Sequence, residues 1–285
     1  MIDVTYPAHD RVAVVAGELR KLPAFLRRDF LQAWSYRMAF VTDAVGLVVQ
    51  ALVFYYVGLM VDQDVLPSYG GQEVSYIEFV IVGIALSTFL ALGLSRVSAA
   101  MRNEQLMGTL ESVLMTPTSP ATIQIGSVVY DLLYIPLRTT AFIVIVGVTI
   151  GLDFHTDGLL PAAAVLLVFV PFVWGLGIAA AAALLTFKRG SGGVGFAAVA
   201  MTLASGAYFP LDLLPNWVST AATKNPMAVS IEAMRESLLG GAGWSEVGSA
   251  LAVVAPAAVT TLVIGIFAFR LALRHERRTG TLGLY

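Results

Sequence analysis

The sequence predicts an all-α polytopic membrane protein with six transmembrane helices, and two observations support that prediction. Of the 285 residues, 58% are hydrophobic and only 13% are charged, and the mean hydropathy is +0.80. Soluble domains are about a quarter charged, so a water-soluble globule of this composition would lack polar surface. The apolar residues also gather in blocks long enough to cross a bilayer, which takes about 20 residues.

Six such blocks are separated by polar segments, and basic residues set their orientation. We expect the spans at about 38–60, 77–97, 122–150, 160–187, 194–214 and 249–270. Most of the 17 Lys and Arg residues lie before the first span, between the second and third, between the fourth and fifth, and after the sixth. Because Lys and Arg concentrate in cytoplasmic loops, both termini are expected in the cytoplasm.

This topology divides the chain into a cytoplasmic N-terminal segment (1–37), a transmembrane domain (38–270) and a cytoplasmic tail (271–285). In the N-terminal segment, four apolar residues recur at i, i+4 spacing: Leu22, Leu26, Phe30 and Trp34. An adjacent face is basic. A helix lying in the inner membrane interface accounts for both faces, whereas a generic basic flank does not account for the apolar stripe. No apolar core follows a basic start, so we expect no cleaved signal peptide.

A polar segment, MRNEQLMGTLESVLMTPTSP at 101–120, interrupts the apolar sequence after the second span. We expect it to form a short amphipathic cytoplasmic helix at about 100–116, stopped by Pro117 and Pro120. Glu104, Gly108 and Glu111 share its polar face. A linker that lies on anionic lipid is usually basic on that face. The acidic face therefore favours a protein partner.

Three segments occur in a recognisable order. The first combines Glu104, GTLE at 108–111, Leu114 and the pair Thr116-Pro117. The second is SGAYFPLDLLPNW at 205–217, followed by NPMAVSIEAMRESLLG at 225–240, and the third is RHERRTGTLGLY at 274–285. In order, spacing and topology, these segments resemble the ABC type-2 transporter permeases. The resemblance covers nearly the whole chain and implies a prokaryotic inner-membrane protein.

The resemblance implies that the polar segment is a coupling helix, which docks on a separate ABC ATPase subunit and carries its movement into the membrane. The implied ATPase-contact residues are Glu104, Gly108, Thr109 and Glu111. Gly108 lets a partner backbone approach closely, and the glutamates suit basic partner residues. The family's full transporter has two membrane halves, so the chain is expected to pair with a second copy or a similar permease.

The resemblance also implies short re-entrant helices at about 209–248, between the fifth and sixth spans. The residues implied to shape an outer gate are Pro210, Asp212, Pro215 and Trp217. Ile231, Met234 and Leu238 repeat at helical spacing in this segment. The alternative is an amphipathic helix that merely rests on the outer leaflet.

Two intramembrane features invite a functional interpretation. Arg138 is expected near the middle of the third span, and Asp131 lies seven residues earlier on roughly the same face. Two turns is a long reach for an ion pair, and Asp43 in the first span is another candidate partner for Arg138. Charges at this depth are costly and face protein or water. Arg138 is therefore either part of a structural ion pair or a contact for an anionic group of the substrate.

The chain shows no energy-converting chemistry of its own. No lysine follows a glycine in the register of a phosphate-binding loop. Cysteine is absent, and His9, His155 and His275 lie in three different regions, which disfavours a metal site or a catalytic triad. We therefore expect no enzyme activity and no bound cofactor, with ATP and Mg on the partner ATPase. Membrane lipids are expected partners and nucleic acid is not.

These observations favour a permease that exports a hydrophobic or amphiphilic drug-like or lipid cargo. The first alternative is a secondary transporter driven by an ion gradient, for which Asp43, Asp131 and Pro136 offer slight support, although no inverted repeat is visible. The others are an exporter of a lipid-linked glycan and a membrane subunit that anchors or regulates a partner. The identity of the cargo does not follow from the residues.

Overall fold

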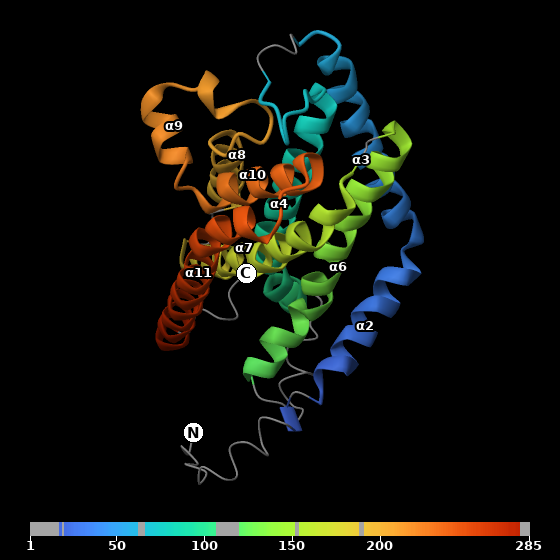
Figure 1. The fold of residues 1–285 in the computed structure, drawn as a ribbon. Helices are drawn as coiled ribbons and strands as arrows, with labels where there is room; N and C mark the ends of the chain where they lie inside the picture. The colour runs from blue at the N-terminus through green and yellow to red at the C-terminus, as the bar shows by residue number, and fades with distance from the viewer. Residues whose placement is uncertain are drawn as a thin grey trace.

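Helices dominate the computed structural model, which describes residues 17–18, 20–61, 66–106, 120–151, 154–187 and 191–279. Five helices in these ranges are long and apolar enough to cross a membrane (Figure 1). They are α3 (Arg37–Gly58), α4 (Tyr76–Leu106), α6 (Pro120–Ile150), α7 (Leu159–Phe187) and α11 (Trp244–Thr279). The one β feature in the described residues is an isolated bridge between Tyr69 and Gln72. The chain is therefore a helical, multi-pass membrane protein.

The fifth predicted span differs from the expectation. The helix α8 (Ser191–Leu203) has 13 residues and ends 11 residues before the expected boundary at Leu214. At about 1.5 Å per residue it is shorter than the hydrocarbon core of a bilayer. The chain then turns through Gly206, whose φ of 68° disfavours side chains other than glycine. Pro210 follows, and proline cannot continue a helix.

Two other predicted helix boundaries also differ from the structure. The helix expected from about residue 100 is not separate at its start, because residues 101–106 continue α4 without a break. No glycine or proline lies between Gly93 and Gly108 to interrupt it. Similarly, α11 extends to Thr279, nine residues past the expected end of the sixth span.

The N-terminal segment contains a separate helix, α2 (Leu22–Ser35). Tyr36, with φ −101° and ψ 51°, separates it from α3. α2 packs along the lower part of α6 in Figure 1, while its own residues include none that is buried. Its position therefore depends on a few contacts with α6 and α3.

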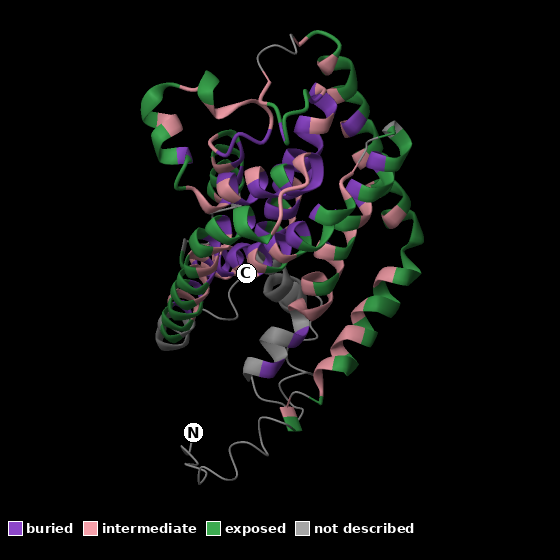
Figure 2. Ribbon diagram, viewed as in Figure 1, coloured by how far each residue is buried: buried purple, intermediate pink, exposed green. Residues whose placement is uncertain are grey.

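The core surrounds α4, which is buried on all sides over much of its length (Figure 2). Phe79, Ile84, Phe89 and Leu90 are at most 1% exposed. α6, α7, α8 and α10 (Pro226–Gly240) all pack against it. A helix without a polar face must be enclosed by other apolar surfaces, and α4 is the enclosed helix here.

α7 and α11 pack along much of their length. A Cβ atom at Gly175 would lie 2.4 Å from backbone atoms of Thr261 and Leu262. Only a glycine permits this approach, since backbone atoms cannot rotate away. Gly175 is therefore a point of close packing between α7 and α11.

The segment between α8 and α11 contains the 3₁₀ helix η3 (Leu211–Leu213) and two short helices, α9 (Asn216–Ala222) and α10. Asn225 caps α10 by accepting a hydrogen bond from the backbone of Met227. The apolar stripe Ile231, Met234 and Leu238 is at most 4% exposed. It packs against protein, so α10 does not rest on a lipid surface with this face.

Candidate functional site

The four predicted ATPase-contact residues lie at and beyond the end of α4 in the sequence. Glu104 belongs to the last turns of this helix. Gly108, Thr109 and Glu111 lie outside the described residues. Their role in coupling stays a prediction.

Arg138 and Asp43 form a two-pronged ion pair between α6 and α3. Nε of Arg138 donates to Oδ2 of Asp43, and Nη2 donates to Oδ1 at 2.6 Å. The Arg138 side chain is only 9% exposed, whereas that of Asp43 is 38% exposed. Paired donors facing both carboxylate oxygens are the strongest arrangement available to arginine. The fork of the guanidinium is directed at Asp43.

Asp131 does not share this arginine. Its carboxylate lies 3.9 Å from Nη1 of Arg96 on α4, and Arg96 is largely exposed. This separation is at the outer limit of an ion pair, and such a pair contributes little to stability. Of the three intramembrane charges predicted from sequence, the structure thus brings Arg138 and Asp43 together and turns Asp131 towards another helix.

The four predicted outer-gate residues lie on the segment that follows α8. Pro210 precedes η3 and Pro215 precedes α9, and their φ angles of −57° and −54° suit the start of a helix. Asp212, Pro215 and Trp217 are exposed, Trp217 by 78%. These side chains shape the surface of the segment, and they do not form its buried centre.

That centre is occupied by Arg235 on α10, a residue that the sequence pattern did not single out. Its side chain is 2% exposed. The guanidinium donates to three backbone carbonyls, at 2.8 Å to Phe79, 3.0 Å to Gly206 and 3.1 Å to Ala207. It also stacks 3.5 Å above the centroid of the Phe79 ring. One side chain thus joins α10 to the start of α4 and to the turn after α8.

Two further groups complete this arrangement, which we name the Arg235 cluster: Arg235, Glu232, Tyr69 and Phe79, with the carbonyls of Gly206 and Ala207. Nη1 of Arg235 lies 3.5 Å from Oε2 of Glu232. The Tyr69 hydroxyl donates to the same oxygen at 3.1 Å.

Burial shifts the ionisation of two groups in the Arg235 cluster. Burial raises the pKa of Tyr69 well above its usual value, so its phenol remains a neutral donor. Burial also lowers the pKa of Arg235, an effect that Tyr69 and Glu232 oppose. In the sequence, the signal that could have identified Arg235 is a base three residues after Glu232 inside an otherwise apolar stripe.

The Arg235 cluster fixes the segment between α8 and α11, which we name the outer segment after its predicted side, to the central helix α4. Tyr76 adds a second link, since its hydroxyl donates to the carbonyl of Tyr208 at 2.9 Å. Tyr208 in turn stacks on Phe54 of α3, with ring centroids 5.1 Å apart. The start of α4, the turn after α8 and α10 therefore form one connected unit, so a displacement of α4 would reach the outer segment.

The sequence that forms these elements matches one known family. A family model described as ABC-2 type transporter matches residues 20–239. The chain belongs to the ABC-2 type transporter family. A search of curated proteins gives no match.

As a member of the ABC-2 type transporters, the chain is a permease component of an ABC transporter, and such permeases work with an ABC ATPase subunit. The family match extends from α2 almost to the end of α10. It therefore includes the polar segment at 101–120, the pair Asp43–Arg138 and the Arg235 cluster. α11 lies beyond the matched residues.

Proposed function

We propose that this ABC-2 permease exports a hydrophobic or amphiphilic cargo, and that a separate ATPase drives it through the polar segment after α4. ATP and Mg²⁺ belong to the ATPase in this proposal. A second copy of the chain or a similar permease supplies the other half of the translocation path.

The continuity of α4 is the observation that supports this proposal. The helix runs from Tyr76 to Leu106 in 31 residues. Its first turn contacts the Arg235 cluster at Phe79, and its last turns contain Glu104. At 1.5 Å per residue, these two points are about 38 Å apart along one unbroken helix. A push on the polar segment would therefore move the outer segment without an intervening hinge.

The geometry of Arg138 favours the structural interpretation of this residue. Two of its nitrogens donate to Asp43 and its side chain is almost buried. A substrate anion would have to displace a carboxylate that already matches the fork. The proposed role of the pair is to hold α3 against α6, and the cargo is recognised elsewhere by apolar contacts.

The test of coupling is co-purification of the ABC ATPase subunit with the permease, followed by ATPase and export assays in proteoliposomes. The variant Gly108→Trp with Glu111→Ala should lose both ATPase association and export. The control Glu73→Ala removes the same charge from an exposed position before the other end of α4 and should behave like wild type.

Two results would contradict the proposal. The first is unchanged ATPase association and export in the double variant. The second is transport that needs no ATPase subunit and collapses with a protonophore, which would establish the ion-coupled alternative. A panel of drug-like, lipid and lipid-linked glycan compounds in the ATPase assay would then identify the cargo class by stimulation.

A further inference from the structure

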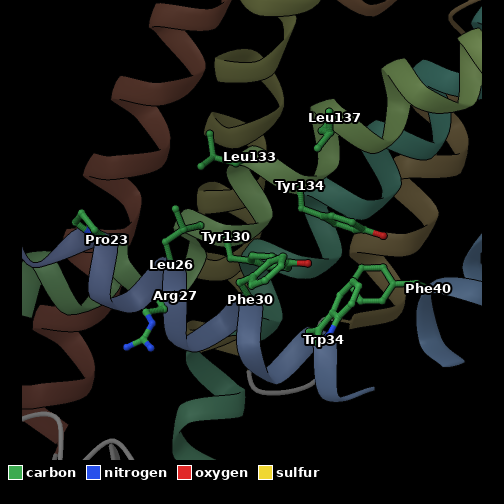
Figure 3. A pocket seen from close by; sticks show the side chains of 10 residues that line it. All are labelled: Pro23, Leu26, Arg27, Phe30, Trp34, Phe40, Tyr130, Leu133, Tyr134 and Leu137. Atoms are coloured by element: carbon green, nitrogen blue, oxygen red, sulfur yellow. The ribbon is translucent and has the colours of Figure 1, made fainter. Parts of the chain in front are cut away.

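A cavity of about 510 Å³ lies between α2, the start of α3 and α6 (Figure 3). It takes no part in the coupling route proposed above. The lining residues come from three elements: Pro23, Leu26, Arg27, Phe30, Trp34, Phe40, Tyr130, Leu133, Tyr134 and Leu137. Its volume falls in the range of about 300–1,000 Å³ that is usual for small-molecule sites.

Five of the ten lining residues are aromatic, and their rings brace one another. Phe30 and Trp34 stack on α2 with centroids 6.0 Å apart, and Tyr130 and Tyr134 stack on α6 at 5.5 Å. Phe40 of α3 meets Tyr134 edge to face at 5.6 Å. Figure 3 shows these rings gathered between the helices. Such paired rings have a fixed shape and present flat apolar surface.

Fixed contacts at both ends keep the cavity open. At one end the Phe25 ring of α2 lies so close to Gly126 of α6 that a Cβ there would approach it to 2.5 Å. At the other end the pair Asp43–Arg138 joins α3 to α6. Between these contacts the helices do not close on each other. Phe30 and Trp34 remain 49% and 57% exposed.

An apolar cavity of this kind is unsuited to water, because a cavity without enough polar partners stays dry. In a membrane protein the available filler is the hydrocarbon chain of a lipid. α2 also carries an apolar stripe beside a basic face, the pattern of a helix that lies at the boundary between headgroups and acyl chains. The cavity therefore opens where acyl chains are available.

The charge at the rim selects among lipids. Lys21 and Arg28 are paired with Glu18 and Asp29, at 2.5 and 2.7 Å. Arg27 is exposed and forms no ion pair within the part of the chain that the structure describes. In Figure 3 its guanidinium points away from the aromatic wall. An arginine in this position can receive a phosphate while the stem of its side chain stays on apolar surface.

We propose that the cavity binds an anionic glycerophospholipid of the leaflet in which α2 lies, with one acyl chain among the aromatic rings and the phosphate beside Arg27. The lipid fills the space between α2 and α6 and so holds the interfacial helix in place. This site concerns a resident membrane lipid, and it is independent of the cargo and of the ATPase.

The test uses Trp34 as a reporter in the full chain, reconstituted in phosphatidylcholine vesicles. Three other tryptophans are first replaced by phenylalanine: Trp174, Trp217 and Trp244. Phosphatidylglycerol or phosphatidylcholine with brominated acyl chains is then added, and quenching of Trp34 is measured. One basic contact near a membrane surface corresponds to about a fivefold preference for the anionic lipid. We expect saturable quenching with about that preference.

Two arginine variants distinguish a specific lipid site from nonspecific electrostatic attraction of the anionic lipid to the protein. Arg27→Gln should abolish the preference for phosphatidylglycerol. Arg20→Gln removes the same charge from an exposed position of the chain that does not line the cavity, and it should retain the preference. Leu133→Phe should lower quenching by both lipids, because the larger ring occupies the space of the acyl chain.

Several outcomes would overturn the proposal. Equal losses in Arg27→Gln and Arg20→Gln would mean that only the overall charge attracts the lipid. Equal quenching by both brominated lipids in the parent protein would mean ordinary contact with the bilayer. Absence of quenching by either lipid would mean that another polypeptide, such as a second copy, covers Trp34.

Discussion

Replacing Arg235 by methionine should loosen the turn after α8. Methionine is a flexible side chain that fills irregular space but donates no hydrogen bond. The change removes the three bonds to the carbonyls of Phe79, Gly206 and Ala207. Because the site is 2% exposed, water cannot replace these donors without opening the segment.

The magnitude follows from the atoms that lose partners. The carbonyls of Gly206 and Ala207 lie outside helices, and an unsatisfied buried acceptor costs about 1–3 kcal/mol. The contact of the guanidinium with the Phe79 ring contributes up to about 2 kcal/mol when desolvated. Removing the buried charge recovers several kcal/mol of desolvation cost. We expect a net loss of about 2–3 kcal/mol in the free energy of local unfolding. This loss is less than the cost of leaving a buried charge unpaired, because Glu232 is 46% exposed and remains hydrated.

Hydrogen exchange of the reconstituted protein measures this loss locally. A cost of about 2–3 kcal/mol corresponds to about 30- to 150-fold faster exchange of the amides at 204–209, if they open as one unit. Arg235→Lys should give an intermediate rate, since a single ammonium cannot match the three directions of the fork. Lys224→Met is the control, because Lys224 is the exposed base of the same segment. Unchanged protection in Arg235→Met would refute the reasoning.

Three other predictions concern separate contacts. In a double-mutant cycle, Asp43→Asn and Arg138→Gln should show a coupling of about 1–3 kcal/mol in unfolding free energy. By contrast, Asp131→Asn should change the unfolding free energy by less than about 1 kcal/mol. Additive effects of Asp43→Asn and Arg138→Gln would exclude a structural pair. Gly175→Ala should lower the thermal midpoint through a loss of about 1–3 kcal/mol, because its Cβ would lie 2.4 Å from the backbone of α11; a normal midpoint would show that the two helices separate freely. The raised pKa of Tyr69 means that its phenol contributes stability fully below pH 10, the value of an unperturbed tyrosine, and loses it above. Wild type should therefore lose about 1.4 kcal/mol more per pH unit above 10 than Tyr69→Phe in an alkaline unfolding series, and parallel curves would contradict the burial.

Long apolar helices are predictable from sequence because the length of an apolar block is a local property. The expected first span at 38–60 corresponds to α3 at Arg37–Gly58, and the fourth at 160–187 to α7 at Leu159–Phe187. The apolar stripe of 22–34 likewise predicts α2 within one residue. The predicted end of the fifth span was wrong, because the residues after Leu203 are mostly apolar yet do not continue the helix. Gly206 adopts a left-handed conformation in a turn that Arg235 holds from α10.

The sequence by itself determined the helical membrane class, the position of most helices and the resemblance to ABC type-2 permeases, since these depend on apolar length and on short motifs. Only the tertiary structure decided which charges meet. Arg138 pairs with Asp43, 95 residues away, and not with Asp131 on its own helix. Arg235 is buried because carbonyls 28, 29 and 156 residues away converge on it. The packing of the helices determines such partners, and no periodicity along the chain encodes contacts between residues so far apart in sequence.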